Sequence, residues 1–362
     1  MIDFSFNIPT RILFSRGAVR NNAEALRLGT RAFVVTGKSS GRLSGALNDV
    51  ERELDALHIA YETFEGVGNN PQVEQCRELG ARARAFRADF IIGIGGGSPI
   101  DAAKAVAVFA ATDIEPEMLF QNKYEHVLPI AAVPTTSGTG SEVTPWSVLT
   151  WNKVETKQSF GGIKTFPRVA LLDPSYTESL SPSVTLDTAF DAFSHCLESV
   201  ISTKASPVTD ALNFYALSRF GKLIKPLEHG EHSSIRDELM LVSLLGGIAI
   251  ANTGTTLMHA MGYPLTYFKN VPHGRANAYV LPAYLAEVGA CRPERLEVAL
   301  KALGISQEEL ITFTKCKFPF DVKANTEELS LWATQTALKD PQKTTGVPND
   351  TEHIRELYEM LF

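Results

Sequence analysis

The stretch IIGIGGGSPIDAAKAVAVF, residues 91–109, decides the fold of the first half of this chain. An apolar run leads into a glycine run that contains Gly96 and Gly97, and Ser98 and Asp101 follow where a helix would start. Glycines let the backbone approach a ligand closely, and the N–H groups at a helix start attract an anion. We therefore predict a strand, a turn and a helix that hold a pyrophosphate. The spacing departs from GxGxxG, and an ordinary tight connection is the competing interpretation.

Short apolar runs alternate with helical patterns through the first half of the chain. The runs are rich in β-branched residues and cover 32–37, 89–97, 128–136 and 169–174. Their alternation with helical patterns such as residues 50–60 predicts a parallel sheet with crossover helices. From a helix entry at 181–185 onward, apolar residues recur at helical spacing with few strand candidates. We predict an α/β nucleotide-binding domain over residues 1–178 and an all-helical domain over 179–362, with a cleft between them.

Length and composition limit the class of protein. A chain of 362 residues with 44% hydrophobic content exceeds the usual size of one core, so two domains are expected. Lys and Arg number 34 against 41 Asp and Glu, without a basic stripe, which argues against nucleic acid as a partner. The four cysteines form no CxxC pair, as expected for free thiols in a reducing compartment. With no signal peptide and no apolar stretch long enough for a membrane span, we expect a cytoplasmic protein.

A second polar turn, TGKSSGR at residues 36–42, follows the first apolar run. A P-loop would need glycine at position 32, where Ala32 stands, so we reject that motif. An acidic residue at the end of such a strand commonly binds the adenosine ribose of NAD, but Gly37, Lys38 and Ser39 offer a cation and a hydroxyl instead. This composition favours the 2′-phosphate of NADP, with an ordinary polar turn as the alternative.

A third turn, PTTSGTGSEVT at residues 134–144, follows another apolar run. Hydroxyl side chains and backbone amides on a glycine-containing turn suit contacts with phosphate or ribose, and they are uncommon in a packed core. The turn is therefore a further candidate for the nucleotide site.

Four side chains in the second half have the chemistry of a metal site. Asp191 and His195 are four residues apart, so a helix would place them on one face, although such a pair alone is usually an ordinary surface pair. His259 lies in a helical pattern, and residues 270–272 suggest the start of another helix that carries His273. Three imidazoles and one carboxylate suit Fe²⁺ or Zn²⁺, and the lack of a thiolate argues against a structural zinc site.

Together these motifs resemble a known family. The segments GGGSPIDAAK, PTTSGTGSEVTP, DAFSHCLES and HAMGYPLTYFKNVPHGRANA are similar to those of the iron-containing (group III) alcohol dehydrogenases, especially the short members that act on propanediol or butanol. The resemblance covers nearly the whole chain. It implies a dehydroquinate-synthase-like fold, with a nucleotide-binding α/β domain, a helical domain, and a metal ion in the intervening cleft.

The resemblance also implies roles for individual residues. The metal ligands would be Asp191, His195, His259 and His273. The pyrophosphate would lie on Gly96, Gly97 and Ser98, and the other residues near the cofactor would be Asp101, Asn70, Thr135, Thr136, Thr139, Ser141, Val143, Lys157, Leu180 and His273. The implied reaction is metal-assisted hydride transfer, in which the cation stabilises the alkoxide or polarises the carbonyl of the substrate.

Two positions depart from the family pattern. Tyr263 stands where many relatives carry a histidine taken as a proton relay, so a relay would run through its hydroxyl, water or the cofactor ribose. Trp146 stands where some relatives have a small polar residue facing the substrate. If Trp146 lines the pocket, it favours small or linear substrates, and the alternative is that it is a core residue.

The sequence thus favours an Fe²⁺-dependent alcohol dehydrogenase or aldehyde reductase, with Zn²⁺ or Mn²⁺ as possible metals. We expect NADP(H) in preference to NAD(H), a small primary alcohol, diol or aldehyde as substrate, and a homodimer. One alternative is a Zn²⁺- and NAD-dependent glycerol dehydrogenase. A remote alternative is a dehydroquinate-synthase-type lyase, which would need a dense Lys and Arg cluster where there is mainly Arg275.

Overall fold

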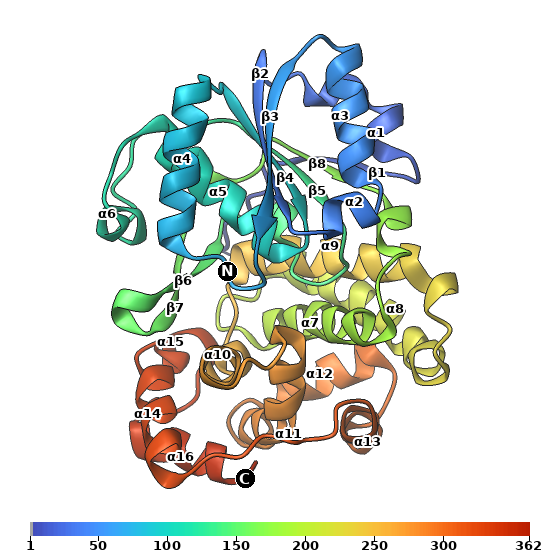
Figure 1. The fold of residues 1–362 in the computed structure, drawn as a ribbon. Coiled ribbons are helices and arrows are strands. Elements are labelled where there is room, and N and C mark those ends of the chain that lie inside the picture. Colours follow the sequence, from blue (N-terminus) through green and yellow to red (C-terminus); the bar gives the residue numbers. More distant parts are fainter. Residues whose placement is uncertain (1–2) are drawn as a thin grey trace. The chain divides into compact units, whose positions relative to one another are not determined.

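The computed structural model describes residues 3–362, which form two compact units (Figure 1). One unit is Ile8–Leu180, and the other contains Ser181–Phe362 together with the described residues up to Asn7. Two hydrogen bonds tie Asn7 to the second unit: its N–H donates to Oδ1 of Asn252 at 2.7 Å, and its carbonyl accepts from Nδ2 of Asn252 at 3.2 Å. The sequence did not predict this N-terminal contribution to the helical unit.

The unit Ile8–Leu180 is built on a six-stranded, fully parallel sheet with the order β1-β8-β5-β4-β2-β3. Its strands are β1 (Arg11–Phe14), β2 (Arg31–Gly37), β3 (Ala60–Val67), β4 (Phe90–Gly95), β5 (Ile130–Pro134) and β8 (Val169–Leu172). The four apolar runs of the sequence form β2, β4, β5 and β8, so the predicted parallel sheet is confirmed.

Helices cover both faces of the sheet, and this explains why its central strands are mostly apolar. In β2, Phe33 and Val35 belong to the core beneath α4 (Val73–Phe86) and α5 (Gly97–Ala111). The alternate residues of the same strand, such as Val34, belong to the core on the other face, which the helices α1 (Ala18–Asn21) and α3 (Ala46–Ala56) cover. Successive side chains of a strand point to opposite faces, so each face receives its own apolar row.

The remaining elements of this unit are short. They are an antiparallel hairpin of β6 (Ser147–Trp151) and β7 (Thr156–Phe160), the helices α1 (Ala18–Asn21), α2 (Ser40–Leu43), α3 (Ala46–Ala56) and α6 (Pro116–Phe120), and the 3₁₀ turns η1 (Ala23–Leu26), η2 (Ser141–Val143), η3 (Asn152–Val154), η4 (Ile163–Thr165) and η5 (Pro174–Thr177).

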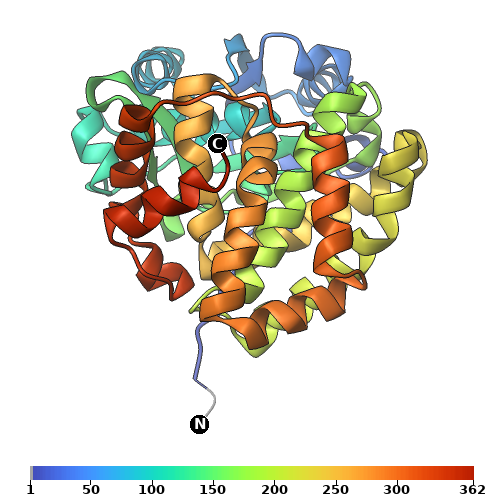
Figure 2. The same cartoon turned by 90° about the horizontal axis from the view of Figure 1, so that it is seen from below.

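The second unit is helical, as predicted (Figure 2). Its elements are α7 (Pro182–Ile201), α8 (Pro207–His229), η6 (His232–Ile235), α9 (Arg236–Thr253), α10 (Leu257–Lys269), α11 (His273–Cys291), α12 (Pro293–Leu303), α13 (Gln307–Lys317), α14 (Thr326–Ala337), α15 (Pro341–Thr345) and α16 (Thr351–Glu359). The N-cap of α7 is Ser181, whose hydroxyl accepts from the N–H of Val184 at 3.3 Å.

The helix α7 lies at the centre of this unit and packs against α8, α9 and α11, while α10 packs against α11. One continuous apolar core joins these helices. Within the described residues, no single helix is long and apolar enough to cross a membrane; one pair, His232–Thr253 with Leu257–Lys269, bent by 107°, meets the test by length and composition only.

Candidate functional site

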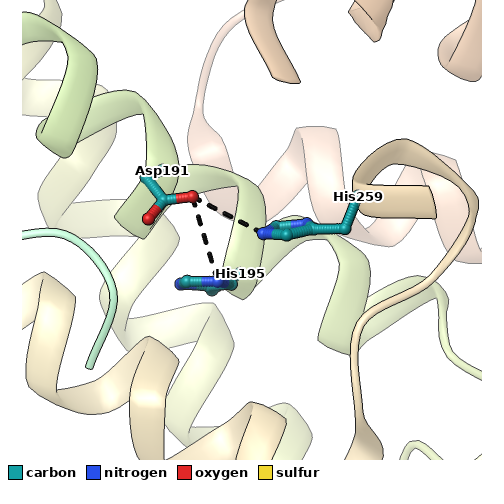
Figure 3. A group of neighbouring side chains, drawn as sticks. All are labelled: Asp191, His195 and His259. Carbon is teal, nitrogen blue, oxygen red and sulfur yellow. Dashed lines mark ion pairs between the residues drawn. The ribbon is translucent and has the colours of Figure 1, made fainter. Parts of the chain in front are cut away.

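The four predicted metal ligands come together in the helical unit. Asp191 and His195 lie one turn apart on α7, His259 lies in the first turn of α10, and His273 begins α11. Figure 3 shows Asp191, His195 and His259 pointing toward one another. The Nε2 atoms of His195, His259 and His273 lie 4.0, 3.5 and 3.7 Å from a single atom, Oδ1 of Asp191.

These separations fit one divalent cation. Tetrahedral ligands bound at about 2.1 Å lie ~3.4 Å from one another, close to the observed distances. The side chains of Asp191, His195 and His259 are 4%, 5% and 2% exposed, whereas that of His273 is 28% exposed. The cluster is therefore enclosed on three sides and open beside His273.

The charges around Asp191 suit a cation. Burial by itself would raise the pKa of Asp191, but His195, His273 and His259 together hold it well below its usual range. Burial disfavours the charged form of His259, yet Glu198 and Asp191 raise its pKa to about 10. The site thus favours positive charge, and a metal ion that binds here would displace a proton of His259.

Sequence reasoning missed two buried side chains of this cluster. Glu198 is fully buried on α7, and one of its carboxylate oxygens is hydrogen-bonded to Nδ1 of His259. Asn277 on α11 donates from Nδ2 to Oδ1 of Asp191 at 3.2 Å. Glu198 could have been found, because positions 191, 195 and 198 follow the helical spacing i, i+4, i+7 and therefore share one face.

A glycine permits the close approach of α7 and α11. A Cβ atom at Gly274 would lie 1.8 Å from the carbonyl oxygen of Asp187. The next residue, Arg275, donates from Nε to Oδ1 of Asp187 at 3.0 Å and from a terminal nitrogen to Oγ of Ser183 at 2.9 Å. Backbone contact and ion pair together fix the start of α11, and with it His273, against α7.

Tyr263 lies at the open side of the cluster. Its ring stacks on that of His273, with 5.6 Å between centroids and 11° between planes. The ammonium group of Lys339 lies 5.8 Å from the centroid of the Tyr263 ring. Tyr263 therefore contacts the most exposed of the four candidate ligands, and its role in a proton relay stays a prediction.

In the α/β unit, the glycine turn and the hydroxyl-rich turn lie side by side. They follow the paired strands β4 and β5, and the N–H of Thr135 donates to the carbonyl of Gly95 at 2.9 Å. A Cβ atom at Gly96 would lie 3.2 Å from Oγ1 of Thr136, and one at Gly97 would lie 2.6 Å from Cγ2 of Thr139. These glycines therefore let the start of α5 approach both threonines.

The Asn-Pro segment and the hairpin adjoin the same region. Oγ of Ser98 donates to the carbonyl of Asn69, the neighbour of Asn70, at 2.6 Å. The carbonyl of Pro71 accepts from the N–H of Thr150, which is paired with Lys157 across the β6–β7 hairpin. The structure thus gathers four separate segments of the predicted nucleotide site within one unit.

Asp101 and Ser141 take part in a buried network. Ser141 donates from Oγ to Oδ1 of Asp101 at 2.5 Å, and the N–H of Val148 donates to Oδ2 at 2.9 Å. The fully buried Lys104 donates to Oγ of Ser141, to Oγ1 of Thr144 and to the carbonyl of Trp146, and burial lowers its pKa to about 8. This network anchors the hydroxyl-rich turn to α5; direct contact of Asp101 or Ser141 with a cofactor stays a prediction.

The polar turn 37–39 lies at the point where the chain changes direction along the sheet. From β2 the chain moves outward to β3, and from β4 it moves through β5 to β8 on the other side. A Cβ atom at Gly37 would lie 3.6 Å from Cγ of Pro99, in the first turn of α5. Open parallel sheets bind ligands at this switch point, outside the carboxyl ends of the strands. The location therefore supports a nucleotide contact for Gly37, Lys38 and Ser39.

The other predicted residues are placed as follows. The side chain of Trp146 is 40% exposed, which excludes the alternative that it is a core residue. Val143 is fully buried in η2, and Leu180 ends the α/β unit. His273 belongs to the helical unit, whereas all the other residues predicted to contact the cofactor lie within residues 8–180.

Both halves of the chain match one family of known proteins. The profile of iron-containing alcohol dehydrogenases matches residues 9–174, and the profile of the C-terminal region of that family matches residues 185–360. A crystal structure of an iron-containing alcohol dehydrogenase from Thermotoga maritima is 38% identical, with a TM-score of 0.93 over 99% of each chain.

Two curated relatives are also similar to this chain. A sulfoacetaldehyde reductase of Bilophila wadsworthia is 30% identical over 94% of this chain and 86% of the relative. An NADPH-dependent butanol dehydrogenase of Clostridium saccharobutylicum is 31% identical over 84% of this chain and 80% of the relative. The resemblance seen in the motifs is confirmed: the chain belongs to the iron-containing alcohol dehydrogenase family and is an NAD(P)-dependent alcohol dehydrogenase.

Proposed function

We propose that this protein is an Fe²⁺-dependent enzyme that interconverts short primary alcohols or diols and their aldehydes, with NADP(H) as the hydride carrier. The observation that carries the proposal is the convergence of three imidazole Nε2 atoms within 4.0 Å of one carboxylate oxygen, Oδ1 of Asp191. A cation held there supplies Lewis-acid stabilisation of the charge that develops on the substrate oxygen. The butanol dehydrogenase and sulfoacetaldehyde reductase among the relatives support a short substrate.

The protein's own residues prepare both parts of the reaction. Asp191 supplies negative charge to the centre of the metal cluster, and the exposed flank at His273 and Tyr263 gives a small substrate access. In the α/β unit, the N–H groups at the start of α5 attract the pyrophosphate, while Gly96 and Gly97 let it approach the backbone. The active site between the two domains, the homodimer and the cytoplasmic location stay predictions from the sequence.

The first test concerns metal and substrate together. The protein, purified without oxygen, should retain about one Fe²⁺ per chain, as implied by the one cluster found among the described residues, Asp191, His195 and His259, with His273 beside it. Rates with NADPH should be highest for unbranched aldehydes of a few carbons, and chelation of the metal should abolish them, with recovery on Fe²⁺ addition. Full activity in the metal-free protein, or no NADPH oxidation with any aldehyde, would contradict the proposal.

The second test concerns the choice between NADP and NAD. We expect Lys38→Ala to lower the NADPH-to-NADH ratio of kcat/KM about 5- to 10-fold, the effect of losing one exposed charge pair worth ~1 kcal/mol. Gly37→Asp should lower the ratio further, because its carboxylate would repel the 2′-phosphate. The one close contact of the added Cβ atom is with Oγ of Ser40 at 2.7 Å, and that hydroxyl can rotate; its other neighbours are at ordinary contact distance. Lys38→Arg, which keeps the charge, is the control, and an unchanged ratio in Lys38→Ala would count against the assignment.

The two alternatives make different demands. A Zn²⁺- and NAD-dependent glycerol dehydrogenase would oxidise glycerol with NAD faster than it oxidises any short alcohol or diol with NADP. Rate assays with both cofactors therefore distinguish it from the proposed enzyme. A dehydroquinate-synthase-type lyase would need cations for a phosphorylated, carboxylated substrate beside the metal cluster. Arg275, the cation closest in sequence to the ligands, is already bonded to Asp187 and Ser183, which disfavours the lyase.

A further inference from the structure

We propose that Glu198 is a positioning residue of the metal centre: it orients His259 and supplies the second negative charge that balances a divalent cation. The inference rests on the proposed function, because it requires a metal ion at the four-ligand cluster. Glu198 does not face the cluster directly. It acts through His259, whose ring lies between the Glu198 carboxylate and Oδ1 of Asp191.

The contacts of Glu198 fix the orientation of the His259 ring. Oε2 of Glu198 is bonded to Nδ1 of His259, so Nδ1 would keep its proton when a metal ion displaces the proton on Nε2, the nitrogen that faces Asp191. Ring stacking between His259 and His195, at 4.7 Å and 18°, holds the same plane from the other side. A histidine oriented in this way needs no reorganisation to bind a metal ion.

The other carboxylate oxygen anchors the helix that carries His259. Oε1 of Glu198 accepts from Oγ1 of Thr256 at 2.6 Å, from the N–H of Thr256 at 2.9 Å and from the N–H of His259 at 3.2 Å. These N–H groups belong to the N-terminus of α10, and the first N–H groups of a helix have no acceptor within the helix. One carboxylate from α7 therefore fixes both the backbone and the ring of His259.

Charge balance points to the same role. Three neutral imidazoles and Asp191 would leave a divalent ion with one uncompensated positive charge in a site whose inner side chains are at most 5% exposed. Uncompensated buried charge is costly. The carboxylate of Glu198, itself fully buried, supplies the missing charge at the far nitrogen of His259 and strengthens that ring as a donor.

The experiment compares Zn²⁺ affinity of the full-length protein and its variants by competition with a chelator. Zn²⁺ is redox-inert and takes the same nitrogen and oxygen ligands. Glu198→Gln keeps the shape of the side chain and removes its charge, so we expect Zn²⁺ to bind 10- to 100-fold more weakly. The proton resonance of His259 Nδ1–H in the Zn²⁺-bound protein should move upfield, because its acceptor is no longer charged.

Two controls separate positioning from mere stability. Glu287 on α11 pairs with His353 at 3.0 Å. Glu287 lies fourteen residues beyond His273 and thus ~21 Å from it along the helix. Glu287→Gln therefore removes a similar carboxylate–histidine pair elsewhere in the helical unit. Thr256→Val removes a hydroxyl donor to Glu198 but leaves its contact with the His259 ring. Glu287→Gln should bind Zn²⁺ within about 3-fold of the wild type, as expected for a distant, independent site. Thr256→Val, which loosens only the anchor of α10, should lose clearly less affinity than Glu198→Gln.

The outcomes discriminate clearly. Wild-type Zn²⁺ affinity in a folded Glu198→Gln protein would overturn the proposal, as would an equal loss of affinity in either control. Failure of the wild-type protein itself to bind Zn²⁺ or Fe²⁺ would instead refute the metal site on which the proposed function depends.

Discussion

Replacing His259 with alanine is expected to remove the metal ion and to lower turnover at least ~10³-fold, the equivalent of several kcal/mol of lost charge stabilisation. Nε2 of His259 is the imidazole nitrogen nearest to Oδ1 of Asp191, at 3.5 Å, and its ring also contacts the rings of His195 and His273. Without it, three of the four candidate ligands remain.

The His259→Ala protein should nevertheless fold. Glu198 would keep the N–H groups of Thr256 and of residue 259 and the hydroxyl of Thr256, so its buried charge would stay hydrogen-bonded. We expect a loss of about 1–3 kcal/mol in the free energy of unfolding, the usual range for a buried substitution. His353→Ala, which removes a histidine paired with Glu287 instead, is the control and should retain the metal. Metal content after dialysis, NADPH-dependent rates and thermal unfolding would measure these effects; full activity of His259→Ala would refute the metal assignment.

The parts of the fold that could be predicted are those buried on two sides. The strands β2, β4, β5 and β8 are mostly apolar because both faces of the sheet are covered, and such runs are visible in a sequence. The edge strands β1 and β3 were not predicted, because they are only partly buried and β3 contains two glutamates. The attachment of Asn7 to Asn252 involves polar groups 245 residues apart, which no local pattern reveals.

The candidate site, like the fold, could be predicted from the sequence only in part. The i, i+4 spacing of Asp191 and His195 predicts one helix face, but no spacing shows that His259 and His273, on two other helices, reach that face. Their convergence was implied by the resemblance to a family. The spacing places Glu198 on the helix face of Asp191 and His195, but it does not show the partners of Glu198, because Thr256 and the Nδ1 atom of His259 lie about sixty residues away. The role of Glu198 as a partner of His259 is evident only from the hydrogen bonds between α7 and the start of α10.

The second large effect is expected from Gly274→Ala. A Cβ atom there would lie 1.8 Å from the carbonyl oxygen of Asp187, well inside any allowed contact, so α7 and α11 would have to move apart. Alanine gains at most about 1 kcal/mol over glycine in helix propensity, whereas overpacking of this kind costs about 1–3 kcal/mol or more. The free energy of unfolding should therefore fall, and a lower melting temperature would show it.

The displacement also acts on the metal cluster, because His273 precedes Gly274 and faces Asp191, its Nε2 atom 3.7 Å from Oδ1. Metal-site geometry tolerates errors of only about 0.2 Å, so we expect Gly274→Ala to bind Fe²⁺ and Zn²⁺ at least ~10-fold more weakly. The matched control is Gly221→Ala on α8, where a Cβ atom would lie 1.9 Å from the carbonyl of Leu303 on α12. That variant carries a comparable clash away from the four ligands, so it should lose stability and keep its metal affinity in the folded state. Equal losses of metal affinity in both variants would show that the cluster depends on general packing of the helical unit, and wild-type affinity in Gly274→Ala would show that the contact between α7 and α11 does not set its geometry.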